Sequence, residues 1–389
     1  MKFKGITIGV PREIMAGERR VAMTPETAGK FIQAGAQVML EAGAGQGAFY
    51  PDEDYAAAGV QLVQGPEMVY SQADLVLKVK EPKFNQALQK HEAEMMPEGC
   101  TLVTFLHPAN PANHDMIKML ANGNITSFTL DGIPRISRAQ QMDPLTSMST
   151  AAGYKAAITA ANHLPRFIPM MPTAAGILQP AQFIVIGIGV AGLQSVATAK
   201  RLGAKVKALD IRPEANEQAR SLGVQLIPFD LPEGMGVGQG GYACRLTEEW
   251  YAKEREALAP HVADSDVIIL TALVPGEKAP ILIDEAMIKS MKKGSVIVDI
   301  SIDQGGNCQL TRAGEEYYHE GVLISGLANI PATLASDSTS MFAQNVWHYL
   351  SHIVKDGKVD RDAEDQIIRE SLVTRDGKIV HQGTLLAMG

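Results

Sequence analysis

Residues 183–210, FIVIGIGVAGLQSVATAKRLGAKVKALD, constrain the fold of this chain more than any other segment. An apolar strand pattern runs into a G-x-G-x-x-G turn, an Ala-rich helix pattern follows, and a second strand pattern ends at Asp210. In such a turn the first glycine permits the tight bend, the second lets the backbone approach a pyrophosphate, and the third allows the helix to pack closely on the strand. The segment therefore predicts a βαβ unit that binds a dinucleotide through Gly187, Ile188, Gly189, Val190 and Gly192.

The end of the second strand bears on which dinucleotide would bind. An acid at the position of Asp210 accepts hydrogen bonds from the ribose hydroxyls and repels a 2′-phosphate, which favours NAD(H) over NADP(H). Arg212, just past the strand, could instead receive such a phosphate, so the sequence leaves this point open. Ile211 lies between them, and Leu273 follows the later strand pattern DVIILTA; we expect both to contact the cofactor.

Strand and helix patterns alternate along nearly the whole chain of 389 residues, which implies parallel βαβ units. The alternation restarts at Gln182, after a junction near residues 143–165. We therefore expect an α/β protein with two Rossmann-like domains, whose parallel sheets are separated by a cleft. The expected domains are 1–145 with 341–389, and 146–340: a long helix over 341–354 returns to the first domain, and RDGK near the C-terminus predicts a hairpin.

Composition excludes several classes of function. The net charge is −8 without a basic block, which argues against nucleic-acid binding. The three cysteines lie far apart and form no metal-binding spacing, as in proteins of a reducing compartment. The N-terminus shows no signal-peptide pattern, and no apolar run approaches the roughly 20 residues that a membrane span needs. We expect a soluble cytoplasmic protein without direct membrane insertion.

A polar loop, IPRISRAQQMD at residues 133–143, separates the strand pattern NITSFTLDGI from a helix pattern rich in small residues. It concentrates arginine, glutamine and aspartate side chains, all strong hydrogen-bonding groups, at the end of a strand. The carboxyl ends of parallel strands are where open α/β sheets bind ligands. The candidate ligand-binding residues here are Arg135, Arg138, Gln140 and Asp143.

Four further residues in strand-end loops could form a second kind of pocket. Arg20 would bind a carboxylate, Lys80 would polarise a carbonyl group and His107 would act as an acid–base group. Asp303 would orient ammonia. Each residue taken alone is better explained as an ordinary loop residue, whereas all four together favour a pocket.

These motifs resemble the family shared by alanine dehydrogenase and the NAD(H)-binding domain of proton-translocating transhydrogenase, over essentially the whole chain. PRISRAQQMD is similar to the transhydrogenase loop that embraces the nicotinamide end of NAD(H), which implies that role for Arg135, Gln140 and Asp143. GQGGYA resembles the mobile loop of that branch, which implies that Gly241 and Tyr242 close over bound nucleotide.

Other segments resemble the dehydrogenase branch. KVKEP, TFLHPA and DISIDQGG are similar to its pocket segments and include the counterparts of its Lys, His and Asp, namely Lys80, His107 and Asp303. Arg20 is found in both branches and does not separate them.

The loops favour transhydrogenase. The resemblance then implies a subunit that binds NAD(H) and passes hydride between NADH and NADP⁺ held on a partner. The membrane-embedded and NADP(H)-binding subunits would lie on separate chains and would hold this chain at the inner face of the membrane. A homodimer through the second domain is expected. The alternatives are an NAD-dependent alanine dehydrogenase, with catalytic Arg20, Lys80, His107 and Asp303, and a nucleotide-binding regulatory protein without turnover.

Overall fold

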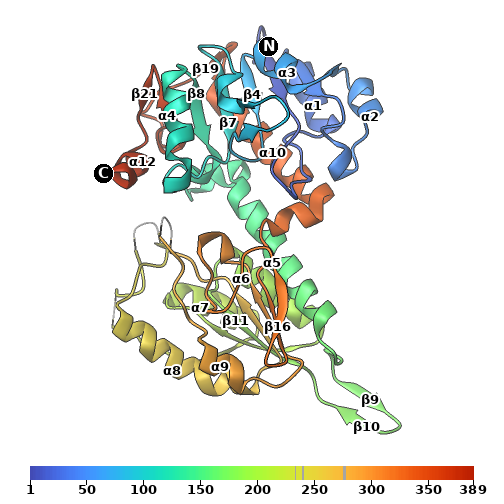
Figure 1. Ribbon diagram of the computed structural model, residues 1–389, viewed down its shortest axis with the longest axis vertical. Coiled ribbons are helices and arrows are strands. Elements are labelled where there is room, and N and C mark those ends of the chain that lie inside the picture. The colour runs from blue at the N-terminus through green and yellow to red at the C-terminus, as the bar shows by residue number, and fades with distance from the viewer. Residues whose placement is uncertain (233, 239–240, 275–276) are drawn as a thin grey trace. The chain divides into compact units, whose positions relative to one another are not determined.

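The computed structural model describes residues 1–232, 234–238, 241–274 and 277–389, which divide into two compact units (Figure 1). The first comprises Met1–Met148 with Ala332–Gly389, and the second comprises Ser149–Pro331. The boundaries fall at 148 and 331 rather than at the expected 145 and 340. The reason is that α5 (Pro144–His163) runs past the first expected boundary, and α10 (Ala335–Ile353) begins before residue 341.

The first unit is built on a sheet with the strand order β21-β20-β8-β7-β4-β1-β2-β3. Strands β1 to β8 of this sheet run parallel, whereas β20 and β21 are antiparallel additions at one edge. The strands are β1 (Thr7–Val10), β2 (Gln37–Glu41), β3 (Gln61–Val63), β4 (Leu75–Leu77), β7 (Thr101–Thr104), β8 (Thr126–Thr129), β20 (Leu372–Arg375) and β21 (Lys378–Ile379). Short hairpins are formed by β5 (Phe84–Asn85) with β6 (Lys90–His91), and by β18 (Val354–Lys355) with β19 (Lys358–Val359).

The helices of this unit are α1 (Pro25–Gln33), α2 (Asp52–Ala57), α3 (Pro66–Gln72), α4 (His114–Asn122), α10, α11 (Gln366–Ser371) and α12 (Gln382–Met388). Helix α1 begins where Thr24 forms a capping box with Thr27. The expected long helix is α10, whose apolar residues Phe342, Val346 and Tyr349 lie in the same buried core as β1, so its return to the first domain is confirmed. The hairpin predicted from RDGK is also confirmed, with Asp376 and Gly377 both at positive φ between β20 and β21.

The second unit contains a sheet with the order β13-β12-β11-β14-β15-β17-β16, parallel except for the edge strand β16. Its strands are β11 (Gln182–Ile186), β12 (Lys205–Leu209), β13 (Gln225–Leu226), β14 (Val267–Leu270), β15 (Val296–Asp299), β16 (Glu316–His319) and β17 (Val322–Ser325). Its helices include α6 (Val190–Arg201), α7 (Pro213–Ser221), α8 (Glu248–Asp264) and α9 (Glu285–Ser290). Phe183 and Val185 enter one buried cluster, and Ile184 and Ile186 enter another. Both faces of this sheet are therefore covered, as in doubly wound proteins.

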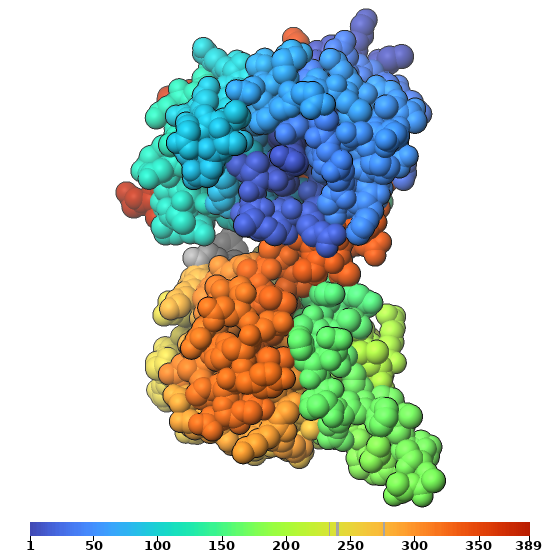
Figure 2. All heavy atoms as spheres, turned by 45° about the vertical axis from the view of Figure 1, so that its right-hand side comes forward, coloured from blue at the N-terminus to red at the C-terminus, as the bar shows by residue number. Residues whose placement is uncertain are grey.

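A hairpin that the sequence analysis did not anticipate joins α5 to β11. Its strands, β9 (Met171–Thr173) and β10 (Gly176–Leu178), project from the second unit (Figures 1 and 2). Ile177 is 63% exposed and Leu178 is 45% exposed, so the hairpin presents apolar side chains to solvent. In the stretches of chain that the structure describes, no helix is both long enough and apolar enough to cross a membrane.

Candidate functional site

The glycine-rich turn lies at the point where the strand order of the second sheet reverses, between β11 and β14. Ligands of open α/β sheets bind at the carboxyl ends of the strands at such a point. Gly187 adopts φ 85°, and a Cβ at Gly192 would lie 2.0 Å from the carbonyl oxygen of Gly187. A Cβ at Gly189 would meet open space. The turn therefore has a tight bend, close helix packing, and a backbone surface at the start of α6 that a phosphate can approach.

The neighbouring strand end is tied to this turn. The Thr271 hydroxyl donates a hydrogen bond of 2.6 Å to the carbonyl oxygen of Gly187. The side chain of Asn307, which is fully buried, accepts from the backbone N–H of Ala272 and donates to the carbonyl oxygens of Ala272 and Pro280. Leu273, predicted to contact the cofactor, follows this braced segment and is 37% exposed. Sequence reasoning missed Thr271 and Asn307, because their partners lie far away along the chain.

Asp210 ends its strand beside the turn, as predicted. Its Oδ2 atom accepts a 2.5 Å hydrogen bond from the backbone N–H of Ile188, inside the glycine-rich turn. The side chain of Arg212 folds back onto the same carboxylate, with Nη2 2.8 Å from Oδ2. Asn216 on α7 bonds both the N–H and the C=O of Asp210. The acid is therefore fixed at the edge of the turn where a ribose would lie.

The segment predicted to close over the nucleotide is described only over some of its residues. Glu233, Gln239 and Gly240 of the 232–243 loop lie outside the described residues. Val237 and Ala243 form an antiparallel bridge, and the N–H of Gly238 donates to the carbonyl oxygen of Tyr242 at 2.7 Å. Gly241 is exposed, and Tyr242 is half-buried.

The polar loop 133–143 of the first unit is anchored by its apolar members, Ile133 and Ala139, which are buried. Residues Ser137–Met142 form a short 3-10 helix. Arg135 and Gln140 are exposed, as required of residues that would reach a ligand. The carboxylate of Asp143 accepts from the N–H and the hydroxyl of Thr146, so it caps the start of α5.

Arg138, also a candidate for cofactor binding, has a structural partner. Its guanidinium pairs with Asp365 at 3.2 Å, and His352 contacts the same carboxylate at 3.1 Å. Asp365 also caps α11. Arg138 thus ties the loop to the C-terminal segment of the first unit.

Arg20 is buried, and the guanidinium nitrogens that could bind a substrate carboxylate already bind Glu18. Nε and Nη2 of Arg20 donate to the two carboxylate oxygens of Glu18 at 2.7 Å and 2.6 Å. A substrate carboxylate would therefore have to share or displace Glu18.

The two lysines of KVKEP differ in environment. Lys78 is buried between Glu13 and Glu92, with ion-pair distances of 3.2 Å and 3.1 Å. The attraction of these carboxylates outweighs burial and raises the pKa of Lys78. Glu13 also accepts a hydrogen bond from the N–H of Val79. Lys80, the candidate, is half-buried, and its backbone carbonyl accepts from Thr104. The sequence analysis singled out Lys80 and missed the buried network that fixes the strand end before it.

His107 follows β7 with φ 44°, an uncommon conformation for a residue other than glycine. Its Nδ1 atom lies 2.8 Å from Oδ1 of Asp131, and its ring stacks on Phe105. Burial lowers the pKa of His107, but the Asp131 carboxylate outweighs this effect, so the pKa is raised overall. His107 thus has the environment of an acid–base group, as the alternative pocket requires.

Asp303 lies in the second unit, on the short 3-10 helix Ile302–Gln304, whereas Arg20, Lys80 and His107 lie in the first.

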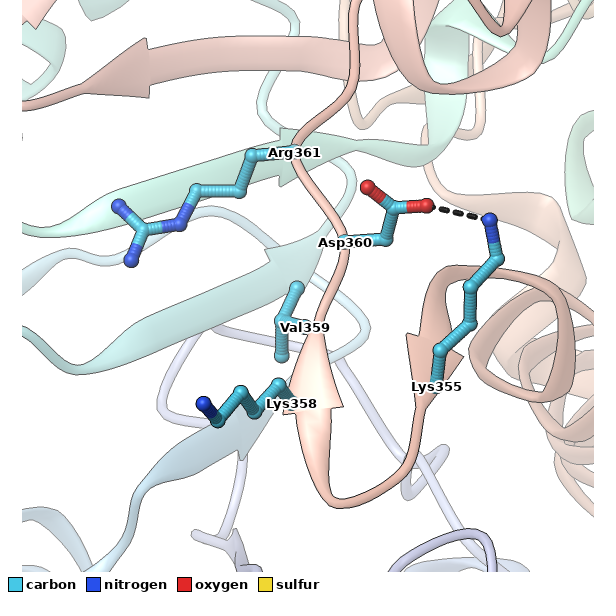
Figure 3. A pocket seen from close by; sticks show the side chains of 5 residues that line it. All are labelled: Lys355, Lys358, Val359, Asp360 and Arg361. Carbon is cyan, nitrogen blue, oxygen red and sulfur yellow. Dashed lines mark hydrogen bonds and ion pairs between the residues drawn. The ribbon is translucent and has the colours of Figure 1, made fainter.

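A separate surface pocket of about 450 Å³ on the first unit is lined by Lys355, Lys358, Val359, Asp360 and Arg361 (Figure 3). Lys355 pairs with Asp360, and Arg361 pairs with Asp376. None of the candidate site residues lines this pocket, so we assign it no part in the candidate site.

A glycine-rich turn at a switch point, followed by an acid at the end of the next strand, defines a dinucleotide-binding protein of the doubly wound class. The N-terminal domain model of alanine dehydrogenase/PNT matches residues 9–152, and the C-terminal domain model matches residues 156–382. The chain belongs to the alanine dehydrogenase/PNT family of oxidoreductases.

Relatives of both branches resemble the chain along its length. It is 42% identical over 378 residues to a Rhodospirillum rubrum protein named as the first part of NAD(P) transhydrogenase subunit alpha, covering 96% of this chain and 97% of the relative. Alanine dehydrogenase of Methanococcus maripaludis is 30% identical over 392 residues, covering 98% and 96%. The solved transhydrogenase of Sinorhizobium meliloti superposes with a TM-score of 0.82 at 34% identity, covering 97% of this chain and 99% of that one. A solved L-alanine dehydrogenase gives 0.80 at 27% identity, covering 98% and 99%.

Proposed function

We propose that this chain is the soluble NAD(H)-binding part of the alpha subunit of a proton-translocating NAD(P)⁺ transhydrogenase. In such an enzyme the alpha subunit is divided between separate chains. The observation that carries the proposal is the 42% identity over nearly the full length of both chains to a relative with that subunit name, against 30% to an alanine dehydrogenase. The glycine-rich turn and Asp210 in the second unit support NAD(H) as the cofactor.

The proposal assigns distinct tasks to the two groups of candidate residues. The backbone of Gly187–Gly192 would hold the pyrophosphate at the start of α6, and Asp210 would accept the ribose hydroxyls. Arg135, Gln140 and Asp143 would contact the nicotinamide end. When bound, NADH supplies a hydride to NADP⁺ on the partner subunit. No proton donor is required, so the chain contributes mainly by positioning the reacting atoms.

The partners follow from the same proposal. Relatives named as transhydrogenase subunits support partner subunits on separate chains. We propose that one partner binds NADP(H) and another is embedded in the membrane, and that they would hold this chain at the inner face of the membrane. We also propose a homodimer through the second unit. The exposed apolar side chains Phe167, Ile177 and Leu178, at and near the β9–β10 hairpin, support this surface as the one that a second copy covers.

The direct test is to mix the purified chain with an NADP(H)-binding partner subunit and follow hydride transfer from NADH to an NADP⁺ analogue with a distinct absorbance. Transfer that requires both proteins supports the proposal, and its absence with a folded, NADH-binding chain contradicts it.

Isothermal titration should show NADH binding more tightly than NADPH, because Asp210 would face the 2′-phosphate. Equal or tighter binding of NADPH would contradict that cofactor assignment.

A second candidate is an NAD-dependent alanine dehydrogenase, which interconverts alanine with pyruvate and ammonia. The His107–Asp131 ion pair favours it, since it gives the histidine a raised pKa suited to proton transfer. Alanine-dependent reduction of NAD⁺ by the isolated chain, at an ordinary turnover of about 10 s⁻¹ and abolished by His107→Ala, would replace the first proposal with this one.

A further inference from the structure

The carboxylate of Asp210 has no acceptor position left for a ribose. Its Oδ1 atom accepts from the backbone N–H and from Nε of Arg212, at 2.8 Å and 2.9 Å. Its Oδ2 atom accepts from the N–H of Ile188 at 2.5 Å and from Nη2 of Arg212 at 2.8 Å. A carboxylate has about four lone-pair sites, so these four hydrogen bonds saturate it.

Two of the four hydrogen bonds can be exchanged and two cannot. Those from Ile188 and from the backbone of Arg212 belong to the turn and the strand end. Those from Nε and Nη2 come from a side chain that can rotate away. The Arg212 side chain is 14% exposed and that of Asp210 is 4% exposed, so the guanidinium covers the carboxylate. A third guanidinium nitrogen, Nη1, donates to the carbonyl oxygen of Gly241 at 3.4 Å.

We propose that Arg212 is a specificity-determining residue that occupies the ribose subsite of the free protein and must leave when a nucleotide binds. The inference rests on the proposed NAD(H) function of Asp210. Ribose hydroxyls then replace the two guanidinium hydrogen bonds, so Arg212 competes with every ligand that uses this acid. The displaced cation remains near the 2′ position, where it partly offsets the repulsion between Asp210 and a 2′-phosphate. Arg212 therefore weakens NADH binding and narrows the preference for NADH over NADPH.

Arg212→Ala tests the proposal by isothermal titration with NADH and NADPH. Asp210 keeps its two backbone hydrogen bonds in this variant, so its carboxylate stays oriented. We expect NADH to bind roughly tenfold more tightly, because binding no longer breaks the two charged hydrogen bonds between Arg212 and Asp210. The affinity for NADPH should not rise by the same factor, so the NADH/NADPH preference should widen. Unchanged or weaker NADH binding by the folded variant would overturn the proposal.

A double-mutant cycle establishes that Arg212 acts through Asp210. In an Asp210→Asn background, Arg212→Ala should give no gain in NADH affinity, since the amide no longer binds the guanidinium as an ion pair. A gain of the same size with and without the acid would overturn the mechanism. Arg212→Lys keeps the cation but lacks the two-pronged contact, so it should give a smaller gain than Arg212→Ala. This variant also serves if Arg212→Ala does not fold.

The matched control is Arg312→Ala, which removes another arginine of the second unit from an exposed ion pair with Glu315. It should leave both affinities unchanged. Thermal unfolding of each variant checks that the fold is retained. If the wild-type chain binds no NADH, the proposed function fails. If the wild-type chain binds NADH and the variants do not follow the expected pattern, only the inference about Arg212 fails.

Discussion

His107 and Asp131 are joined by two hydrogen bonds to one carboxylate. Nδ1 of His107 lies 2.8 Å from Oδ1 of Asp131, and the backbone N–H of His107 donates to Oδ2 at 2.7 Å. The residues follow β7 and β8, which are adjacent parallel strands. Burial alone would raise the pKa of Asp131, but the His107 charge and the hydrogen bonds lower it to about 2. The ion pair therefore fixes the position of the histidine and favours its protonated form.

Asp131→Asn should lower the pKa of His107, as measured by the NMR titration of its ring protons. Because folding raises the pKa of His107, the stabilising effect of this histidine is complete at pH values below its pKa in the unfolded chain. The effect is lost as the pH rises through its pKa in the folded protein. The lowered pKa of Asp131 stabilises the fold above its unfolded value and loses that effect as pH falls toward about 2. The His107 side chain is 41% exposed, so solvent screens part of the attraction between the pair. Asp131→Asn should therefore lower the unfolding free energy by only about 1 kcal/mol, with the largest effect near pH 4–6.

The control for this variant is Asp115→Asn, which removes an exposed carboxylate from its pair with Lys118. It should leave the pKa of His107 unchanged and should change the unfolding free energy by no more than a few tenths of a kcal/mol. An unchanged His107 pKa in Asp131→Asn would show that the ion pair does not set the protonation of the histidine.

Glu254 on α8 should make the stability of the protein fall as pH rises. Burial and then the charge of Asp210 raise the pKa of Glu254 to about 8, and its Oε2 atom has no hydrogen-bond partner among the described residues. Because folding raises the pKa of Glu254 from 4.5, the stabilising effect of its protonation is complete below about pH 4.5. The effect is lost as the pH rises through about 8. Glu254→Gln imitates the neutral acid, so it should raise the unfolding free energy by about 3 kcal/mol at pH 7 and by little at pH 4.

Denaturant unfolding at a series of pH values measures this difference. Glu256→Gln is the matched control, since Glu256 lies on the same helix and is exposed. Its stability should follow that of the wild type at every pH. A constant difference between Glu254→Gln and the wild type from pH 4 to 8 would show that Glu254 does not titrate as described.

Gly192 and Gly189 should respond differently to alanine. A Cβ at Gly192 would lie 2.0 Å from the carbonyl oxygen of Gly187, whereas one at Gly189 would meet nothing within 4 Å. Gly192→Ala should therefore destabilise the fold by roughly 2–3 kcal/mol, since the helix and the turn must move apart. Gly189→Ala should unfold at the wild-type temperature but bind NADH at least tenfold more weakly, because its methyl group occupies the space the pyrophosphate needs.

Calorimetry and NADH titration of both variants test this pair. Equal thermal stability of the two variants would contradict the packing role of Gly192. Wild-type NADH affinity in Gly189→Ala would contradict the assignment of this turn to the nucleotide.

Gln140→Ala and Asp143→Asn should slow hydride transfer between NADH and the NADP⁺ analogue without unfolding the protein. Gln140 is exposed, so its loss should not change the melting temperature. An asparagine at 143 still caps α5, whereas Asp143→Ala should lower stability by about 1 kcal/mol. Gln141→Ala is the control, since its side chain is also exposed and its backbone carbonyl, which the substitution keeps, accepts from Asn345. Transfer slowed equally by Gln141→Ala would contradict a specific role for Gln140.

Local sequence determined the glycine-rich turn, because its requirements are steric and act over a few residues. The spacing of Gly187, Gly189 and Gly192 after an apolar strand is enough to predict the bend and the helix start. The alternation of strand and helix patterns likewise predicted parallel βαβ units, and Asp376-Gly377 predicted the final hairpin. The β9–β10 hairpin escaped prediction because its strands are short and exposed and carry no buried apolar pattern.

Only the tertiary structure decided the charge state and availability of the candidate side chains. Lys78 pairs with Glu13, 65 residues earlier, while its neighbour Lys80 remains half-buried. Arg212 covers Asp210 rather than facing solvent, and Glu254 is buried near the same acid. Sequence spacing specifies which residues end the strands. Burial and ion pairing depend on segments that meet only in the folded chain, because desolvation and Coulomb interactions act through space rather than along the sequence.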